Sequence, residues 1–175
     1  VLAPTRELAE QITSELRPFV RQRGHDAVSV YGGVGYGPQR KALESGAELV
    51  VACPGRLEDL IQSGFVSLGD VDQVVIDEAD RMADMGFMPS VRRLLDRTPS
   101  DRQTVLFSAT LDGDVAKLTK DYQRDPVRHE VGEETPDVKS ATHRFWKIDR
   151  NDRNDVLAEI VKAAWPTIIF CRTRH

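Results

Sequence analysis

The sequence predicts an α/β protein in which helices flank a parallel sheet. The first observation is a series of short, uninterrupted apolar runs, typical of strands buried on both faces, at 49–52, 74–76, 105–107 and 168–170. The second is a set of stretches whose apolar residues recur every third or fourth position, as along one face of a helix, at 8–20, 87–95 and 156–164. The alternation of these segments indicates a sheet covered on both faces.

The first elements follow one another in chain order. Leu8, Ile12 and Leu16 are spaced to share one face of a helix. The apolar runs at 49–52 and 74–76 are expected to form the next strands, because each is short and uninterrupted. The same helical spacing then returns at Phe87, Val91 and Leu94, and the run at 105–107 predicts a further strand.

Residues 125–142 interrupt this pattern. They contain Pro126, Gly132 and Pro136 and show little apolar periodicity, which predicts a linker. A strand–helix–strand pattern resumes after the linker, with strands expected at 143–148 and 168–170. The predicted organisation is therefore a longer first part, a linker and a short second part, at 1–124, 125–142 and 143–175.

The composition is that of a folded protein, with 40% hydrophobic and 30% charged residues. No apolar run is long enough to cross a bilayer, and no basic-then-apolar leader opens the sequence. Cys53 and Cys171 have no partner at metal-ligand spacing, so we expect both to stay reduced in a cytoplasmic protein. Val1 lies inside an apolar run and His175 closely follows another, so we expect a chain cut at both ends.

The net charge of −4 argues mildly against a nucleic-acid partner, because nucleic-acid-binding modules usually carry a basic face. The charges are nevertheless uneven. Basic residues outnumber acids between 17 and 41, whereas acids crowd the stretch 72–84. This distribution fits a protein that handles RNA on one side and a metal on another, and it also fits ordinary solvated surface charge.

Polar or charged residues follow five of the apolar runs directly. These junctions read Pro4-Thr5-Arg6-Glu7, Cys53-Pro54-Gly55-Arg56, Asp77-Glu78-Ala79-Asp80, Ser108-Ala109-Thr110 and Cys171-Arg172-Thr173-Arg174. Ligands of open α/β sheets bind beyond the carboxyl ends of the strands. Five such junctions in order therefore predict one composite site.

The acidic junction carries the clearest chemistry. Asp77 and Glu78 are adjacent at a strand end, and strand alternation would point them in different directions. One carboxylate could then hold a hard cation through its water shell while the other polarises an attacking water. A pair of solvated acids that cap the following helix is the alternative for an isolated Asp-Glu pair.

Taken together, the ordered motifs resemble the DEAD-box helicases, a family of RNA-dependent ATPases with two RecA-like lobes of the P-loop NTPase type. The segments that resemble the family's RNA-contacting motifs are Pro4-Thr5-Arg6-Glu7-Leu8, Gly32-Gly33 and Pro54-Gly55-Arg56. Asp77-Glu78-Ala79-Asp80 matches the tetrad that names the family, and Ser108-Ala109-Thr110 matches the element that couples ATP to unwinding. Residues 168–174 resemble the first conserved segment of the second lobe.

The resemblance implies ATP and Mg²⁺ as cofactors and RNA as the partner. Asp77 would bind Mg²⁺ through water, and Glu78 would orient and deprotonate the hydrolytic water. Asp80 would hydrogen-bond toward Ser108 and Thr110. The implied contacts to the RNA backbone carry no base identity and would come from Pro4, Thr5, Arg6, Glu7, Gly32, Gly33, Pro54, Gly55, Arg56, Thr173 and Arg174.

The sequence departs from the family pattern in two respects. The family usually has Thr where this chain has Cys53, and a thiol is a weak hydrogen-bond donor. The chain also contains no Gly-Lys dipeptide and hence no phosphate-binding loop. We expect that loop upstream of Val1 and the late, arginine-rich second-lobe motif beyond His175. The parent protein is then expected to be an RNA-stimulated ATPase, and these 175 residues alone to be inactive.

Two other functions fit parts of the sequence. A two-lobed translocase that acts on DNA is disfavoured by the complete Asp-Glu-Ala-Asp tetrad. A non-catalytic RNA-binding or partner-docking module that keeps only the fold is disfavoured by the intact Asp77, Glu78, Ser108 and Thr110.

Overall fold

The structure is a computed structural model that describes residues 1–131, 142, 144–149, 151–164 and 166–170. It divides into two compact units, Val1–Arg128 and His129–His175.

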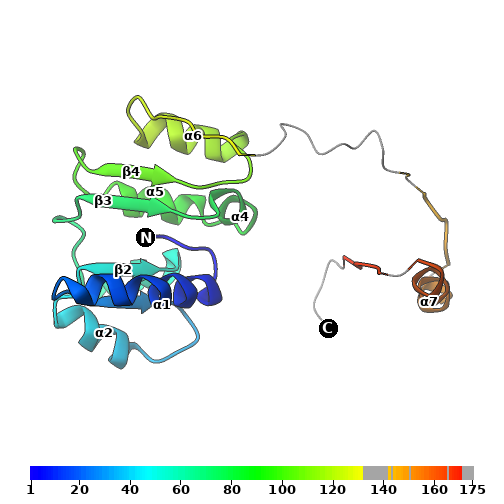
Figure 1. The fold of residues 1–175 in the computed structure, drawn as a ribbon, viewed down its shortest axis with the longest axis horizontal. Coiled ribbons are helices and arrows are strands. Elements are labelled where there is room, and N and C mark those ends of the chain that lie inside the picture. The colour runs from blue at the N-terminus through cyan, green and yellow to red at the C-terminus, as the bar shows by residue number, and fades with distance from the viewer. Residues whose placement is uncertain (132–141, 143, 150, 165, 171–175) are drawn as a thin grey trace. The chain divides into compact units, whose positions relative to one another are not determined.

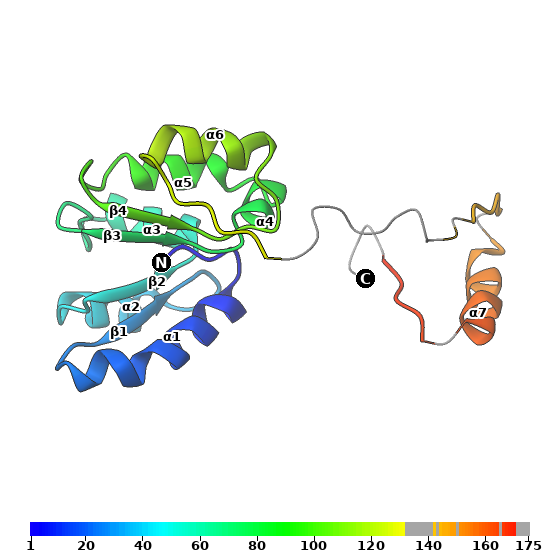
Figure 2. The same cartoon turned by 45° about the horizontal axis from the view of Figure 1, so that its top comes forward.

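The first unit is built on two pairs of parallel strands (Figure 1). In the first pair, β1 (Ala27–Val30) lies beside β2 (Leu49–Ala52). In the second pair, β3 (Gln73–Ile76) lies beside β4 (Gln103–Leu106). The strands of each pair run side by side in both views (Figures 1 and 2). In each pair, the carboxyl ends of the two strands therefore lie at the same edge.

Leu2 joins the two pairs into one layer. It forms parallel bridges to Ala52 of β2 and to Ile76 of β3. Its N–H donates to the carbonyl of Val75 at 2.7 Å, and its carbonyl accepts from the N–H of Asp77 at 2.9 Å. The resulting order is β1, β2, residues 1–3, β3 and β4, with the N-terminal segment at the centre.

Helices cover both faces of this layer. In chain order they are α1 (Arg6–Gln22), α2 (Tyr36–Glu44), α3 (Pro54–Gln62), α4 (Ala79–Asp84), α5 (Met88–Leu95) and α6 (Gly113–Tyr122). One face carries a small buried cluster that includes Ala3, Ala9 and Val51, against which α1 packs. The other face carries the main core, to which α3, α4, α5 and α6 contribute buried side chains. Because successive strand residues point to opposite faces, Val51 belongs to the first cluster and Ala52 to the second.

Most of the sequence-predicted elements of this unit are confirmed. The helices expected at 8–20 and 87–95 are α1 and α5, and the strands expected at 49–52 and 74–76 are β2 and β3. β4 starts and ends slightly before the predicted run at 105–107. Apolar patterning does not predict β1 or the helices α2, α3, α4 and α6. Helices α3 and α4 each begin inside one of the polar motifs that follow the strands.

The second unit contains one described helix, α7 (Arg153–Ala163), where a helix was expected at 156–164. The strands expected at 143–148 and 168–170 are wrong for the residues that the structure describes there, because none of these lies in a strand. A parallel strand forms only where a neighbour completes its hydrogen-bond ladder. Here Phe145 and Phe170 are 94% and 92% exposed, so no such packing surrounds them.

The division into lobes and linker remains a prediction. The first compact unit ends at Arg128, close to the predicted boundary after residue 124. Much of the predicted linker, at 132–141, lies outside the described residues. Within the part of the chain that the structure describes, no helix is both long and apolar enough to traverse a bilayer.

Candidate functional site

The tetrad and the Ser-Ala-Thr motif lie at the ends of neighbouring strands. β3 leads into Asp77 and β4 leads toward Ser108, and Ile76 pairs with Leu106 in the ladder between them. Beyond the ladder, the N–H of Ala79 donates to the carbonyl of Phe107 at 3.0 Å. The N–H of Asp80 donates to the Ser108 hydroxyl oxygen at 3.1 Å. Two hydrogen bonds therefore fix the first turn of α4 to the loop after β4.

Glu78 has the backbone conformation that non-glycine residues rarely adopt. Its φ of 50° and ψ of 53° lie in the left-handed region, at the position that immediately precedes α4. The N–H of Glu78 donates to Oδ1 of Asp77 at 3.0 Å, and its Oε2 accepts from Arg81 at 3.0 Å. The left-handed conformation costs about 1–2 kcal/mol for a residue with a Cβ, which the surrounding fold must offset. The two carboxylates also have different partners, the Glu78 N–H for Asp77 and the Arg81 guanidinium for Glu78.

The expected link from Asp80 to the Ser-Ala-Thr motif takes a different form in the structure. The main-chain N–H of Asp80 makes the bond to Ser108, rather than its carboxylate. Within the described residues, no hydrogen bond joins Asp80 to Thr110, whose side chain is exposed. The backbone of the tetrad thus supplies the contact that the carboxylate was expected to make.

The acidic residues offer a metal ion only part of a coordination shell. No group of three or more His, Cys, Asp or Glu residues in the described part of the chain could hold a metal. Mg²⁺ in nucleotide sites is typically held by one or two carboxylates together with waters and the phosphates of the substrate. Asp77 and Glu78 fit that arrangement, and they do not fit a metal held by protein ligands alone.

The glycine pair and the Pro-Gly-Arg motif follow β1 and β2, the other strand pair of the layer, and are joined to each other by hydrogen bonds. Gly33, in the loop after β1, has a φ of +84°, a conformation that glycine adopts without strain. Both Nη1 and Nη2 of Arg56 donate to the carbonyl of Val34 at 3.0 Å. The same guanidinium lies over the ring of Tyr36, 4.1 Å from its centroid. Arg56 therefore ties the first turn of α3 to the glycine loop.

The Pro4-Thr5-Arg6-Glu7 motif starts α1 beside the Pro-Gly-Arg motif. The N–H of Ala3 donates to the carbonyl of Ala52 at 2.9 Å, which places this motif next to the end of β2. The Thr5 hydroxyl oxygen accepts from the N–H of Leu8 at 3.3 Å and so caps the helix. The exposed Arg6 pairs with Glu7 at 3.1 Å. Thr5 thus combines a capping role with a position at the predicted RNA-facing edge.

Cys53 occupies the position before α3, where a hydrogen-bonding side chain normally caps a helix. Its thiol makes no capping hydrogen bond, although its N–H donates to the carbonyl of Val30 at 2.8 Å. Burial raises the pKa of the Cys53 thiol from 9.0 to about 11, and the negative charge of Glu7 contributes further. The thiol is therefore protonated at neutral pH. It does not cap the N-terminal end of α3.

Several of the basic residues between 17 and 41 already have partners. Arg17 donates to the carbonyl of Ala27 at 3.2 Å, and Arg21 and Arg40 pair with Asp26 at 3.8 Å and Glu44 at 2.6 Å. The positive charge of this stretch is therefore partly offset within the fold. Thr173 and Arg174, the predicted contacts of the second part, lie outside the described residues.

Two residues near the glycine pair make structural contacts that no sequence motif predicts. Gln39 is only 6% exposed and hydrogen-bonds through both ends of its amide to the backbone of Tyr31. Tyr36 stacks on Arg56. Neither residue carries a sequence signal of its own, because a glutamine or tyrosine in a polar stretch ordinarily lies in solvent.

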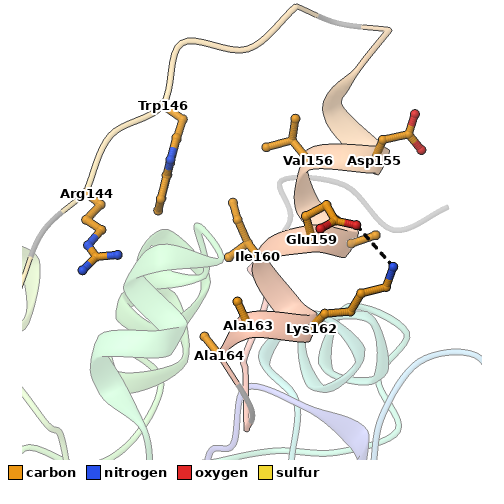
Figure 3. A pocket seen from close by; sticks show the side chains of 10 residues that line it. Arg144, Trp146, Asp155, Val156, Glu159, Ile160, Lys162, Ala163 and Ala164 are labelled. Atoms are coloured by element: carbon orange, nitrogen blue, oxygen red, sulfur yellow. Dashed lines mark hydrogen bonds and ion pairs between the residues drawn. The ribbon is translucent and has the colours of Figure 1, made fainter.

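One hollow, of about 960 Å³, belongs to the second unit (Figure 3). It is open and lies between α7 and the extended segment that carries Arg144 and Trp146. Glu159 and Lys162 on α7 form an ion pair at 3.3 Å at this surface (Figure 3). None of the lining residues is a predicted site residue, so the hollow adds nothing to the site at the strand ends.

The acidic tetrad, the Ser108 hydroxyl and the glycine loop thus lie along the strand ends of one parallel α/β layer. Comparisons with known proteins identify the family. Residues 1–118 match the model of the DEAD/DEAH box helicase family, and the chain belongs to that family. The resemblance drawn from the motifs and the RecA-like α/β class are both confirmed.

Two relatives illustrate the likeness. The chain is 36% identical over 179 residues to the ATP-dependent RNA helicase RhlB of Shewanella amazonensis, an alignment that covers 100% of the chain and 41% of the relative. It is 40% identical to a solved structure, a hypothetical ATP-dependent RNA helicase from Sulfolobus tokodaii, with a TM-score of 0.67 over 71% of this chain and 37% of that one. The chain thus spans about two-fifths of the length of the curated relative that it matches.

Proposed function

We propose that this chain is part of an ATP-dependent RNA helicase that couples hydrolysis of Mg-ATP to sequence-independent RNA binding and local duplex unwinding. The observation that carries the proposal is the pair of hydrogen bonds from Ala79 and Asp80 to the Phe107–Ser108 segment. These bonds join the acidic tetrad to the Ser-Ala-Thr motif, which would couple ATP hydrolysis to unwinding. The family match supports the same assignment.

On the nucleotide side, Asp77 and Glu78 would have separate roles. Asp77 would hold Mg²⁺ through a water molecule, and the metal, when bound, would offset the charge of the phosphates. Glu78 would orient the attacking water and accept its proton. Oε2 of Glu78 accepts from Arg81, so Oε1 is the oxygen that can face the water. The left-handed backbone of Glu78, with a φ of 50°, supports separate roles for the two acids.

On the RNA side, Thr5, Gly33 and Arg56 would meet the sugar–phosphate backbone. Gly33 lets the main chain approach a strand closely, since no Cβ intervenes. Arg56 uses only part of its five donors on Val34 and keeps others for a phosphate. Contacts of this kind position a strand without reading its bases, so affinity would be independent of sequence and would fall with salt.

A titration of labelled single-stranded RNA tests the RNA side directly. The chain should bind oligonucleotides of different sequence with similar affinity, and added salt should weaken all of them alike. Arg56→Ala should weaken binding about tenfold, as expected for one charge-assisted phosphate contact. Clear preference for one base sequence would contradict the proposal.

Hydrolysis is tested separately because these 175 residues hold no Gly-Lys dipeptide. Without a lysine for the β- and γ-phosphates, the chain alone should release no phosphate above the level of its Glu78→Gln variant. Steady release that disappears in Glu78→Gln would show that the chain is sufficient by itself. In the full-length protein, nucleotide should change RNA affinity, since a helicase couples its two ligands and a non-catalytic module does not.

A further inference from the structure

We propose that helix α2 (Tyr36–Glu44) is a positioning element of the RNA site, in which Gln39 fixes the glycine loop and Tyr36 fixes the guanidinium of Arg56. The inference deepens the proposed function and rests on it. None of the motifs recognised in the sequence includes either residue. Both act on the two RNA motifs that flank α2 in the chain, one before it and one after it.

The contacts of Gln39 are the first observation. Its side chain is 6% exposed, and its Nε2 donates to the carbonyl of Tyr31 at 3.0 Å while its Oε1 accepts from the N–H of Tyr31 at 3.3 Å. Burial of an amide is unfavourable unless both its donor and its acceptor are satisfied. Here both are satisfied by a single residue at the end of β1, directly before Gly32. Gln39 thus clamps the peptide from which the glycine loop departs.

The surroundings of Arg56 are the second, independent observation. The Tyr36 ring lies under the guanidinium at 4.1 Å, and the Tyr36 hydroxyl donates to Oδ2 of Asp59 at 3.2 Å. Tyr36 is therefore held at both its ring and its hydroxyl by α3. Arg56 in turn holds the carbonyl of Val34 with two donors. The guanidinium has a defined plane before any RNA arrives.

Together these contacts form a closed frame. α2 is bonded back to the end of β1 through Gln39 and forward to α3 through Tyr36. The loop at 32–35, which includes Gly33 at a φ of +84°, lies between the Tyr31 backbone bound by Gln39 and the start of α2. A flexible glycine loop would lose conformational entropy on binding, and a frame that orders it beforehand reduces this cost. Gln39 and Tyr36 are accordingly positioning residues and need not touch RNA.

The test uses the intact chain, labelled single-stranded RNA at low salt and matched variants. Gln39→Leu removes both bonds at similar volume, and Gln62→Leu makes the same change at an exposed position of α3. Gln39→Leu should weaken RNA binding about three- to tenfold, the scale of a partial loss of one charge-assisted contact. It should also speed hydrogen exchange at the amides of residues 32–35. Gln62→Leu should change neither quantity.

A second variant separates positioning from mere folding. In Gln39→Glu at neutral pH the carboxylate still accepts from Tyr31 but has no proton to donate, and burial favours its neutral form. As the pH falls toward 5, the protonated carboxyl regains the donor, so its RNA affinity should approach that of the unaltered chain at the same pH. Circular dichroism at each pH confirms that equal folded fractions are compared.

Tyr36 is tested through Arg56. Tyr36→Phe keeps the ring but loses the hydrogen bond from the hydroxyl to Asp59, so it should weaken RNA binding less than Tyr36→Leu does. Tyr36→Leu removes the ring and should weaken binding about threefold, the lower end of the same range. In an Arg56→Ala background, Tyr36→Leu should have no further effect, because a residue that acts through another adds nothing once that other is gone.

The outcomes distinguish the two proposals. If Gln39→Leu and Tyr36→Leu are folded and bind RNA normally while Arg56→Ala does not, α2 has no positioning role and the RNA site stands. If Tyr36→Leu weakens binding equally with and without Arg56, Tyr36 contacts RNA itself and the frame is wrong. If neither Arg56→Ala nor Thr5→Ala alters affinity, the proposed RNA site fails and the role of α2 fails with it.

Discussion

The main-chain N–H of Asp80, in the first turn of α4, donates to the hydroxyl of Ser108 at 3.1 Å, although the two residues are 28 positions apart in the chain. The last residue of the acidic tetrad is thereby bound to the first residue of the Ser-Ala-Thr motif. The bond adds to the one between Ala79 and Phe107, and both close the gap beyond the β3–β4 ladder. Any shift of one motif must therefore displace the other or break these bonds.

Removal of the Ser108 hydroxyl should loosen this junction. Ser108→Ala leaves the partly buried N–H of Asp80 without its acceptor, and should lower the free energy of unfolding by about 1 kcal/mol. Urea denaturation measures the change, and hydrogen exchange at Asp80 should accelerate. Thr110→Ala is the control, since Thr110 is exposed and its loss should stay within about 0.5 kcal/mol. Equal effects of the two substitutions would contradict the importance of the bond.

Glycine at position 78 should stabilise the fold relative to alanine. Both substitutions remove the ion pair with Arg81, but only glycine adopts a φ of 50° without strain. Glu78→Gly should therefore be more stable than Glu78→Ala by about 1 kcal/mol. Thermal unfolding of the two variants side by side gives the difference. A Glu78→Ala variant as stable as Glu78→Gly would mean that the position carries no backbone strain.

The uncapped start of α3 predicts a stabilising substitution. Cys53→Thr supplies a hydroxyl oxygen that can accept from the free N–H groups of Gly55 or Arg56, and should raise the free energy of unfolding by about 0.5–1 kcal/mol. Cys53→Ala, which offers no acceptor, serves as the comparison. The idea fails if the threonine variant unfolds at the same urea concentration as the alanine variant.

The Cys53 thiol should react slowly with alkylating reagents. Burial raises its pKa to about 11, so very little thiolate exists at pH 8 in the folded chain. In a Cys171→Ser background, the alkylation rate should rise steeply only toward pH 11, whereas the urea-unfolded chain should react in the ordinary way near pH 9. A folded chain that reacts as fast as the unfolded one at pH 8 would contradict the raised pKa.

The same pKa has a consequence for stability. The folded-state pKa of about 11 lies above the ordinary value of 9.0, so the folded state binds the proton more tightly than the unfolded state. The contribution is fully present below about pH 9 and is lost as the pH rises through 11. Cys53→Ala should therefore lose less stability than the unaltered chain between these two pH values.

The main features of the first unit could be predicted from its sequence because they follow from apolar patterning. The runs of β2 and β3 and the stripe of α1 are each a local signal. β1 was missed because Ser29 interrupts its apolar residues, and α3 because Pro54 and Gly55 at its start suggest a loop. Pro54 is nonetheless compatible with the first position of a helix, where its missing N–H has no partner to lose.

The site was predictable to the extent that its residues lie in short motifs. The motifs located the strand ends, and neighbouring parallel strands brought the tetrad close to Ser108. The motifs could not predict which atoms make the contact, because the donor is a main-chain N–H, a group that every residue except proline has. Gln39 was invisible for a related reason: its role depends on a backbone group at Tyr31, whose position only the folded chain defines.

The expected strands of the second unit were wrong because a strand forms only beside another strand that completes its hydrogen bonds. The apolar run at 168–170 has the composition of a buried strand, but Ile168 and Phe170 are 81% and 92% exposed. Apolar patterning alone does not supply the neighbour that a strand needs.

The position of Leu2 at the centre of the layer sets an order of assembly. Residues 1–3 leave the ribosome before β2 and β3 have been synthesised, and they cannot complete their bridges to Ala52 and Ile76 until both strands exist. The two strand pairs join segments that are closer together in the chain, so we expect the middle of the sheet to close last. Contacts over such long stretches of chain slow folding. During that interval the two halves of the sheet present open edges toward each other, and a competing extended peptide could occupy the place of Leu2.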